Sequence, residues 1–319
     1  MKSFSGILYV SEPSVAEEAS LARAVSLAEN NQADLMVVGV VPAVTAGMDM
    51  PSGGPSTGEL REAMAQACRE RLAALIAPHA ARIDIRLDVH VGKVFVEAIR
   101  AVFRHDCDLL MKPAENPDFI ARLFGSDDMQ LLRNCPCPVW LTRAEEASNY
   151  ASIMAAVDFS PDAPDDENHS LNERILELSS SLALSDFSAL HFVHVWDAPG
   201  EILVSSWSDD PREASMAYVE GIRSTHENAL RRFRDRLKEA IGAEAYDHVS
   251  PQFHLRRGMA SRVIPDMARE LQADLVVMGT VARTGVAGLL IGNTAEAILE
   301  QVQCSVLAVK PDDFVSPVK

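Results

Sequence analysis

The sequence contains the same pattern twice. LFGSDDMQLLRNCPCPVWLTR (123–143) aligns with LIGNTAEAILEQVQCSVLAVK (290–310), which places Gly125 on Gly292 and Cys137 on Cys304. An upstream block aligns Gly92 with Gly258, so one residue has been lost from the first copy between the two blocks. The repeats cover nearly all of the 319 residues. They predict two domains, 1–145 and 151–314, joined by a short charged linker at 143–152.

Each copy alternates segments typical of strands with segments typical of helices. In the second copy, apolar runs predict five strands, at 152–159, 189–196, 248–255, 274–278 and 305–309. Apolar residues at helical spacing predict helices at 171–184, 213–241, 263–271 and 294–302. Pro265 is expected in the first turn of its helix, where a missing N–H costs nothing. Because uninterrupted apolar strands indicate burial on both faces, the predicted fold class is α/β, with two tandem Rossmann-like domains, each a five-stranded parallel sheet flanked by helices.

A glycine-rich segment follows the fourth predicted strand of the second copy and ends at Gly292. In parallel sheets, ligands gather at the carboxyl ends of the strands, and a glycine before a helix lets an anion approach the free amides. Arg283 adds a positive charge to this loop, and Asn293 and Glu296 have the spacing of a capping box. The pattern predicts a phosphate-binding loop. A tight turn before a capped helix accounts for the same residues, and neither common phosphate fingerprint is present.

These residues resemble the universal stress protein family, whose nucleotide-binding members carry G-2x-G-9x-G-[S/T] after strand four. The stretch from Gly279 through Ala282 to Gly292 and Asn293 has that spacing. The R-T-G within the loop and the C-x-V-L-x-V-K ending are also similar to the family. Because the resemblance covers both copies, the chain is most similar to the tandem two-domain E type. The resemblance implies a stress-response protein with an ATP site in the second domain.

The chain departs from the family pattern at two positions. Ala282 stands where the second glycine is expected, and its methyl group lies where the backbone should approach a phosphate. Asn293, followed by Thr294, stands where a hydroxyl residue is expected, and its amide can still donate a hydrogen bond. These departures predict weak nucleotide binding at most.

The resemblance also assigns roles to an aspartate that ends strand one, to the backbone near the end of strand two, and to the backbone after strand four. Asp158 has a simpler interpretation as a turn residue in V-D-F-S-P. The candidate ligand-binding residues are Asp158, Val195, Met278, Gly279, Ala282, Arg283, Gly292, Asn293 and Thr294.

The first copy lacks most of the residues that predict a phosphate-binding loop in the second copy. Lys112-Pro113 aligns with Gly279-Thr280, and Ser11 aligns with Asp158. After Gly125 the chain reads Ser126-Asp127-Asp128, so two carboxylates satisfy the helix dipole and would repel a triphosphate. We expect no ATP in the first domain. Lys112 either forms a salt bridge, which is the favoured interpretation, or binds another anion.

Composition excludes several classes of function. The formal net charge of −17 disfavours direct binding to nucleic acids and to anionic membranes. The N-terminus lacks a long signal-peptide core, and no apolar run reaches the roughly 18–20 residues that span a bilayer, so we expect a cytoplasmic protein. The five cysteines argue against a disulfide framework, and C-P-C-P at 135–138 is interpreted as thiols near a strand start.

No catalytic set is recognisable. A G-x-S-x-G elbow is missing from the sequence, and His191 and His194, three residues apart on a predicted strand, point to opposite faces. We therefore expect ordinary hydrogen-bonded histidines and no metal site.

Two further segments bear on ligands and pairing. The segment 199–211 contains Ile202 and Trp207, and it is expected to be buried or to face a ligand, as a lid or as the cover of a pocket or partner surface. The fifth strand of each copy, PVWLTR or SVLAVK, would leave an apolar edge. Family members pair this strand across a dimer axis, so the two copies are expected to form an internal pseudo-dimer. The sequence does not decide whether two chains form a further homodimer.

The leading hypothesis is a non-enzymatic stress-response protein with weak ATP or nucleotide binding in the second domain. The alternative is a scaffold or carrier whose second-domain pocket binds an apolar small molecule instead of ATP. A slow ATPase is a third, weaker hypothesis.

Overall fold

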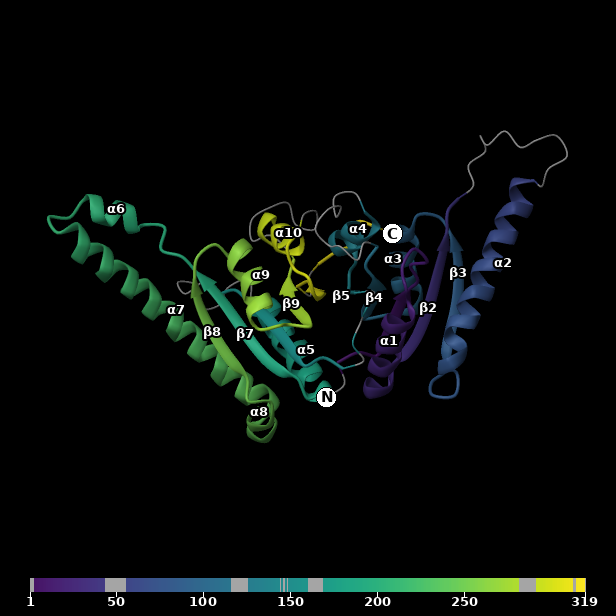
Figure 1. Ribbon diagram of the computed structural model, residues 1–319, viewed down its shortest axis with the longest axis horizontal. Coiled ribbons are helices and arrows are strands. Elements are labelled where there is room, and N and C mark those ends of the chain that lie inside the picture. Colours follow the sequence, from purple (N-terminus) through teal and green to yellow (C-terminus); the bar gives the residue numbers. More distant parts are fainter. Residues whose placement is uncertain are drawn as a thin grey trace.

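The protein forms one continuous ten-stranded sheet with helices on both faces (Figure 1). The strand order is β3-β2-β1-β4-β5-β10-β9-β6-β7-β8, so the first half of the chain supplies one half of the sheet and the second half supplies the other. The computed structural model describes residues 3–43, 56–115, 126–143, 145, 147, 149–159, 169–280, 291–311 and 314–318.

The first half follows the expected alternation of strands and helices. Its elements are β1 (Gly6–Val10), α1 (Glu18–Asn31), β2 (Asp34–Val41), α2 (Thr57–Ile76), the 3-10 turn η1 (Ala77–His79), β3 (Ile85–Val91), α3 (Val94–His105), β4 (Leu109–Pro113), α4 (Asp127–Asn134) and β5 (Val139–Thr142).

The second half repeats this order with longer helices beside its outer strand. Its elements are β6 (Ser152–Val157), α5 (His169–Asp186), β7 (Ala189–Trp196), α6 (Glu201–Ser206), α7 (Pro211–Ile241), α8 (Ala243–Val249), β8 (Gln252–Arg257), α9 (Ala260–Glu270), β9 (Leu275–Gly279), α10 (Asn293–Leu299) and β10 (Ser305–Val309). Within each half the five strands pair in parallel, which confirms the predicted fold class.

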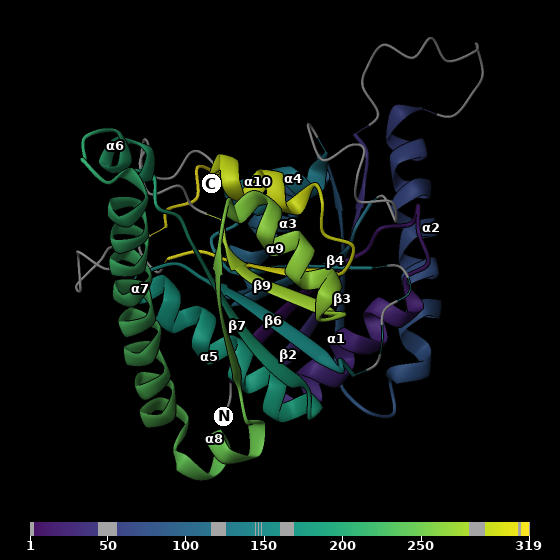
Figure 2. The ribbon, with the colours of Figure 1, turned by 60° about the vertical axis from the view of Figure 1, so that its left-hand side comes forward.

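Two apolar layers hold the helices on the sheet. One layer joins α1, α2, α5 and α7 to one face, and the other joins α3, α4, α9 and α10 to the opposite face (Figures 1 and 2). Alternate residues of each central strand enter opposite layers, as Leu275 and Val276 do in β9. The central strands are therefore buried on both sides, which explains their uninterrupted apolar sequences.

The two halves meet through antiparallel pairing of their fifth strands. Trp140 of β5 lies opposite Leu307 of β10, and Arg143 N donates to Ser305 Oγ at 3.1 Å. Each strand would otherwise be the edge of its own parallel sheet, so the pairing removes two exposed edges at once. The expected internal pseudo-dimer is thus present in a single chain.

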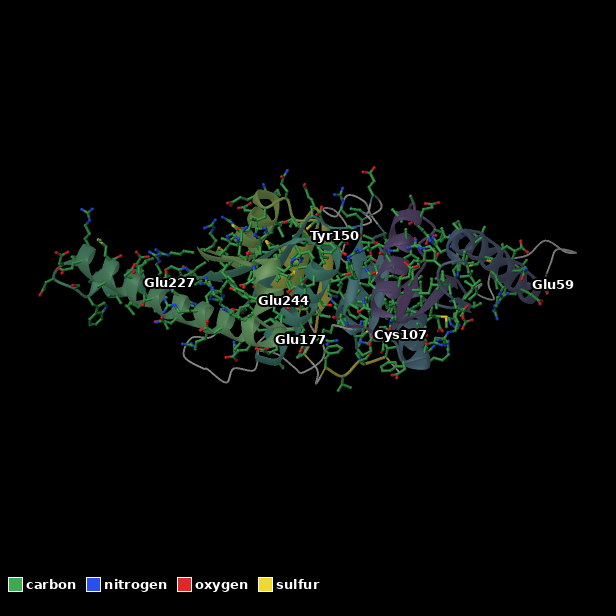
Figure 3. The ribbon with its side chains drawn as sticks, turned by 90° about the horizontal axis from the view of Figure 1, so that it is seen from below. Glu59, Cys107, Tyr150, Glu177, Glu227 and Glu244 are labelled. Atoms are coloured by element: carbon green, nitrogen blue, oxygen red, sulfur yellow. The ribbon has the colours of Figure 1, made fainter. Side chains whose placement is uncertain are left out.

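A buried ion pair reinforces this junction. Arg23 of α1 donates to Asp186, the last residue of α5, through two hydrogen bonds of 3.0 and 2.6 Å. The guanidinium of Arg23 also lies 4.5 Å from the ring centroid of Tyr150, which sits near the middle of the molecule (Figure 3). This paired geometry satisfies a charge that is almost fully removed from water.

Strand register corrects the alignment of the two copies at strand one. Ile7 pairs with Leu109 in the first half, as Ile153 pairs with Leu275 in the second, and both isoleucines enter the same apolar layer. The counterpart of Asp158 is therefore Glu12. The predicted alignment with Ser11 is wrong because a shift of one residue would put every side chain on the opposite face.

The same correction applies at strand four. Met111 pairs with Trp140, and Val277 pairs with Leu307, so Met111 and Val277 occupy equivalent positions. Lys112 is therefore equivalent to Met278, not to Gly279 as the sequence alignment had it. This one-residue difference decides which side chain of the first half occupies the carboxyl edge of β4.

Two local predictions in the second half also need correction. The segment 248–255 is only partly a strand, because α8 ends at Val249 and β8 begins at Gln252. Pro265 lies inside α9, beyond its first turn, and its missing N–H leaves the carbonyl of Ser261 without that helical bond. Gln301 Nε2 donates to this carbonyl at 2.9 Å, which compensates for the loss.

Candidate functional site

The predicted second-half residues meet at the carboxyl edge of neighbouring strands. Asp158 follows β6 directly, Val195 is the penultimate residue of β7, and Met278 and Gly279 end β9. Because β6 lies between β7 and β9, the structure brings these four positions to one edge. Asp158 is exposed, Val195 and Gly279 are half-buried, and Met278 is buried.

The start of α10 is tied to the end of β9 by the backbone. Gly292 N donates to the Thr280 carbonyl at 3.0 Å, while Thr280 N donates to the Val309 carbonyl at 3.2 Å. The two ends of the glycine-rich loop therefore lie side by side. Asn293 and Thr294 are exposed, so the first turn of α10 is open to solvent on the side that they occupy.

The predicted capping box at α10 is wrong. The N-cap position belongs to Gly292, which has no side chain to cap with, and Asn293 is already helical. Glu296 does not reach back to the cap. Its Oε1 instead accepts a hydrogen bond of 2.9 Å from Arg133 of α4, across the junction of the halves. The Gly292 N–H, which a capping glutamate would bind, already donates to the Thr280 carbonyl.

Several residues that shape this edge carried no recognisable sequence signal. Asn172 of α5 clamps the backbone of Asp158, accepting from its N–H at 3.2 Å and donating to its carbonyl at 2.7 Å. Leu171 packs so closely on Gly279 that a Cβ there would lie 2.6 Å from Leu171 Cδ2. Gly279 is thus explained by helix packing, without any need for a bound phosphate.

Thr280 is the third overlooked residue. Its side chain is buried at this edge, and its Oγ1 has no hydrogen-bond partner in the described part of the chain. A buried hydroxyl in this state is a ready donor or acceptor for a ligand. The predicted site residues Ala282 and Arg283 lie outside the described residues.

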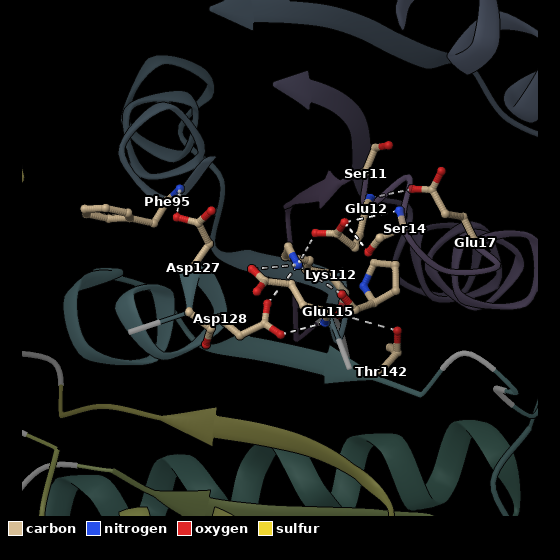
Figure 4. A network of polar contacts seen from close by, with 12 residues as sticks. Ser11, Glu12, Ser14, Glu17, Phe95, Lys112, Glu115, Asp127, Asp128 and Thr142 are labelled. Atoms are coloured by element: carbon tan, nitrogen blue, oxygen red, sulfur yellow. Dashed lines mark hydrogen bonds and ion pairs between the residues drawn. The ribbon is translucent and has the colours of Figure 1, made fainter. Parts of the chain in front are cut away.

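The corresponding edge of the first half is filled by an internal ion network centred on Lys112 (Figure 4). Lys112 is fully buried, and its Nζ lies 2.8 Å from Asp128 Oδ1, 2.9 Å from Glu12 Oε2 and 3.7 Å from Glu115 Oε1. Asp128 Oδ2 also accepts from Glu115 N at 2.8 Å. The favoured interpretation of Lys112 as a salt-bridge residue is confirmed.

Electrostatics in this network follow from burial and from the single cation. Burial would lower the pKa of Lys112, but the carboxylates of Asp128 and Glu12 outweigh it and raise that pKa above its usual value. For Glu12, burial is offset by Lys112, which holds the pKa of this carboxyl below its usual range. Burial and the neighbouring Asp128 raise the pKa of Glu115. Three carboxylates share one ammonium, so side chains occupy the carboxyl edge of β4 and the summed charge of the network is negative.

The helix that begins here is capped internally. Ser126 Oγ accepts from Met129 N at 3.2 Å, whereas Asp127 Oδ1 accepts from Phe95 N at 3.3 Å (Figure 4). The two carboxylates were expected to satisfy the dipole of α4. Their hydrogen bonds go instead to Lys112, Glu115 and Phe95, while the hydroxyl of Ser126 caps the helix.

The histidines on β7 form hydrogen bonds, as expected. His191 Nδ1 lies 3.2 Å from His254 Nε2, and His194 bonds to the Val157 carbonyl at 3.1 Å and to His226 at 2.8 Å. His191 and His194 belong to opposite faces of the sheet. Within the described ranges, no group of three or more His, Cys, Asp or Glu side chains could hold a metal ion.

The expected lid is wrong. Ile202 and Trp207 are 80% and 85% exposed. Figure 1 shows why: α6 packs on the outer end of the long helix α7, far from α10 and the end of β9. Gly200 lets the segment turn against Tyr218, since a Cβ at Gly200 would lie 2.6 Å from the tyrosine hydroxyl. The segment therefore neither covers the edge nor lines it.

Comparisons with known proteins agree with the doubled fold. The sequence pattern of the universal stress protein family matches residues 4–143 and again residues 149–310. Universal stress protein E of Salmonella typhi is 30% identical over 240 residues, which is 74% of this chain and 71% of the relative. Universal stress protein E of Photorhabdus laumondii is 26% identical over 100% of this chain and 99% of its own.

A solved structure gives the same picture. The crystal structure of a functionally unknown protein from Pseudomonas aeruginosa PAO1 is similar, with a TM-score of 0.68 and 26% identity. The match covers 98% of this chain and 94% of that one.

Among the described residues, no helix is long and apolar enough to cross a lipid bilayer.

Proposed function

Since the chain belongs to the universal stress protein family, as a tandem two-domain member of the E type, we propose that it is a non-enzymatic stress-response protein whose second half binds ATP or a related nucleotide weakly. The observation that carries the proposal is the difference between the two carboxyl edges. Lys112 fills the first with an ion network, whereas the second ends in Met278, Gly279 and an uncapped helix start.

The chemistry of the second edge suits a phosphate group. Backbone amides at a helix start carry partial positive charge, and the Gly292 cap has no side chain to compete with an anion for them. The buried hydroxyl of Thr280 stands beside this start and can hydrogen-bond a phosphate oxygen or a water on it. In this proposal Asp158, which follows the neighbouring strand β6, accepts hydrogen bonds from ribose hydroxyls of the nucleotide.

Two features set the expected affinity low. Ala282 adds a methyl group at a motif glycine, and α10 has only seven residues, so its dipole is short. We propose that bound nucleotide shifts a conformational or partner equilibrium and is not turned over. Such a shift is limited to the difference in nucleotide affinity between the two states.

The second candidate is a carrier for an apolar small molecule. An open hollow of about 500 Å³, lined by Leu184, Ile241, Ala243 and His248 among others, lies between α5, α7 and α8. Leu184 lies near the end of α5, and α5 begins at the carboxyl edge of β6, so this hollow faces the opposite edge of the sheet. The two candidates therefore predict different ligands at different places.

Calorimetric titration with Mg-ATP tests the proposal, using wild type, Gly292→Asp and the matched first-half variant Ser126→Asp. Gly292→Asp places a carboxylate at the open cap and should weaken binding at least about tenfold, or about 1.4 kcal/mol. Ser126→Asp exchanges one good capping residue for another and should leave binding unchanged. Equal binding by wild type and Gly292→Asp would exclude the nucleotide site.

Mass spectrometry of ligand extracted from purified protein separates the candidates. Nucleotide in the extract supports the first candidate, and an apolar molecule without nucleotide supports the carrier. Release of phosphate from ATP by wild type but not by Gly292→Asp would show a slow ATPase instead of a binding protein.

A further inference from the structure

Two buried thiols lie side by side at the junction of the halves. Cys135 follows α4 and Cys137 precedes β5, with only Pro136 between them. Their sulfur atoms are 3.5 Å apart, and the residues are 0% and 8% exposed. Two sulfurs in this arrangement need only small side-chain movements to reach bonding distance.

A cation from the other half of the chain lies against this pair. Lys310, directly after β10, donates from Nζ to the Cys135 carbonyl at 2.5 Å, and the residue is only 5% exposed. The ring of Phe314 lies over the same ammonium, with the centroid 4.2 Å from Nζ. A buried ammonium beside two thiols favours a thiolate and opposes a bound metal cation.

The second half has no equivalent pair. By the symmetry of the β5–β10 pairing, Cys304 corresponds to Cys137, and Val302 takes the position of Cys135. Cys304 is 7% exposed, which matches Cys137 in burial. Arg143, the counterpart of Lys310, is exposed. The chain thus contains its own control, a thiol of similar burial whose sequence neighbour two residues before it is Val302 and not a second cysteine.

The surroundings make the two sulfurs unequal. Burial would raise the pKa of the Cys135 thiol, but the hydrogen bond with Cys137 and the charge of Lys310 together hold that pKa below its usual value. The hydrogen bond with Cys135, together with burial, raises the pKa of Cys137 well above its usual value. Because Lys310 Nζ is hydrogen-bonded to the carbonyl of Cys135 itself, Cys135 is the stronger candidate for the attacking thiolate, and Cys137 for the second thiol.

We propose that Cys135 and Cys137 form a peroxide-responsive dithiol that oxidises to an intramolecular disulfide, with Lys310 as its positioning residue. Lys310 joins the second half to the carbonyl of Cys135 in the first. Oxidation thus acts on a contact between the two halves.

The chemistry balances with hydrogen peroxide as the oxidant. The Cys135 thiolate attacks one peroxide oxygen, the O–O bond breaks, and hydroxide leaves, which gives a sulfenic acid on Cys135. The Cys137 sulfur then attacks that sulfur, the S–O bond breaks, and the second oxygen leaves as water. Overall two thiols lose two electrons and two protons, and one peroxide becomes two waters.

The first test needs no variant. Full-length reduced protein is treated with hydrogen peroxide, alkylated in denaturant and digested with trypsin. The peptide Asn134–Arg143 contains both thiols and no other cysteine. We expect it to become two hydrogens lighter and to take no alkyl group, while the peptides of Cys304 and Cys107 stay fully alkylated. A peptide that remains doubly alkylated, or a crosslink from Cys137 to Cys107, would overturn the proposal.

Variants separate the roles of the two sulfurs. In Cys137→Ser, a sulfenic acid should accumulate on Cys135 and react with dimedone, whereas Cys137 of Cys135→Ser should stay unlabelled. Lys310→Met should slow dimedone labelling of Cys137→Ser by about tenfold, the effect of one pKa unit on thiolate population, and Lys310→Arg should restore most of the rate. Circular dichroism on the same samples verifies folding. Equal labelling of both single-thiol variants, or an unchanged rate in folded Lys310→Met, would contradict the assignment.

Discussion

Lys112 Nζ lies 2.9 Å from Glu12 Oε2 in the first half, and the equivalent residues of the second half are Met278 and Asp158. An ammonium thus replaces a methionine at one edge of the sheet and neutralises the acid that corresponds to Asp158. The two halves share one fold, but the carboxyl edge of β4 is closed by the ammonium of Lys112, whereas Met278 stands at that position in β9. This difference explains why only the second half is proposed to bind nucleotide.

Lys112→Met, which copies the second half, should destabilise the protein by about 3–5 kcal/mol, because Glu12 and Asp128 would keep buried charges without a cation. Urea unfolding at neutral pH measures this change. The control is Arg269→Met, which breaks an exposed pair with Asp266 and should cost under about 1 kcal/mol. A loss in Lys112→Met no larger than the control would contradict the network.

Asp186→Ala should also cost about 3–5 kcal/mol, because it leaves the Arg23 guanidinium buried without its partner. Since this pair joins α1 to α5, the two halves should unfold in more separate steps. Unfolding followed by calorimetry reports both effects. Asn30→Ala removes an exposed hydrogen bond to Ser185 at the same junction and should change stability by under about 0.5 kcal/mol. The prediction fails if both variants behave alike.

Burial lowers the pKa of Lys310 from 10.5 to about 8. Between these values the unfolded chain binds more protons than the folded one, so the free energy of unfolding rises with pH from about 8 to about 10.5. As pH falls over the same range this stability is lost, and the loss is complete near pH 8. The full contribution is about 3 kcal/mol. Because Cys135 and Cys137 face the same ammonium, their own titration would change the curve. The two proteins compared therefore both carry Cys135→Ser and Cys137→Ser, and only one of them also carries Lys310→Met. Parallel stability–pH curves for the two would contradict the prediction.

Trp207→Ala should leave ATP binding within about twofold of wild type, or about 0.4 kcal/mol, because Trp207 is exposed at the end of α6, and α6 lies at the outer end of α7, away from α10 (Figure 1). Titration calorimetry of this variant beside Gly292→Asp makes the comparison direct. A tenfold loss in Trp207→Ala would restore the lid that the structure rules out.

Much of the fold follows from the sequence because apolar periodicity and the internal repeat are strong local signals. The strands and most helices were predictable in this way, whereas the pairing of the fifth strands was expected from the resemblance to the universal stress protein family. The helix α6, which contains Ile202 and ends just before Trp207, was not predictable, because an apolar segment does not specify which surface it packs on. Here α7 extends beyond the sheet and carries α6 with it (Figure 1).

The sequence predicted that the candidate site lies at the carboxyl edge of the sheet, but it did not predict the side-chain contacts there. The ion pair of Lys112 with Glu12 depends on strand register, and a one-residue error in aligning the copies hides it. Likewise, Arg23 and Asp186 are 163 residues apart, so only the assembled junction brings them together. Glu296 has the spacing of a capping residue, yet it binds Arg133 of the other half.

We propose that the Lys112 network closes one edge of the sheet and that the other edge can take a nucleotide, so each chain should bind a single ATP in its second half. Native mass spectrometry of the full chain with saturating Mg-ATP counts bound nucleotides in wild type, Gly292→Asp and Ser126→Asp. We expect one, none and one ATP per chain, respectively. Two nucleotides bound to wild type would contradict this expectation. A nucleotide that Gly292→Asp retains and Ser126→Asp loses would also contradict it.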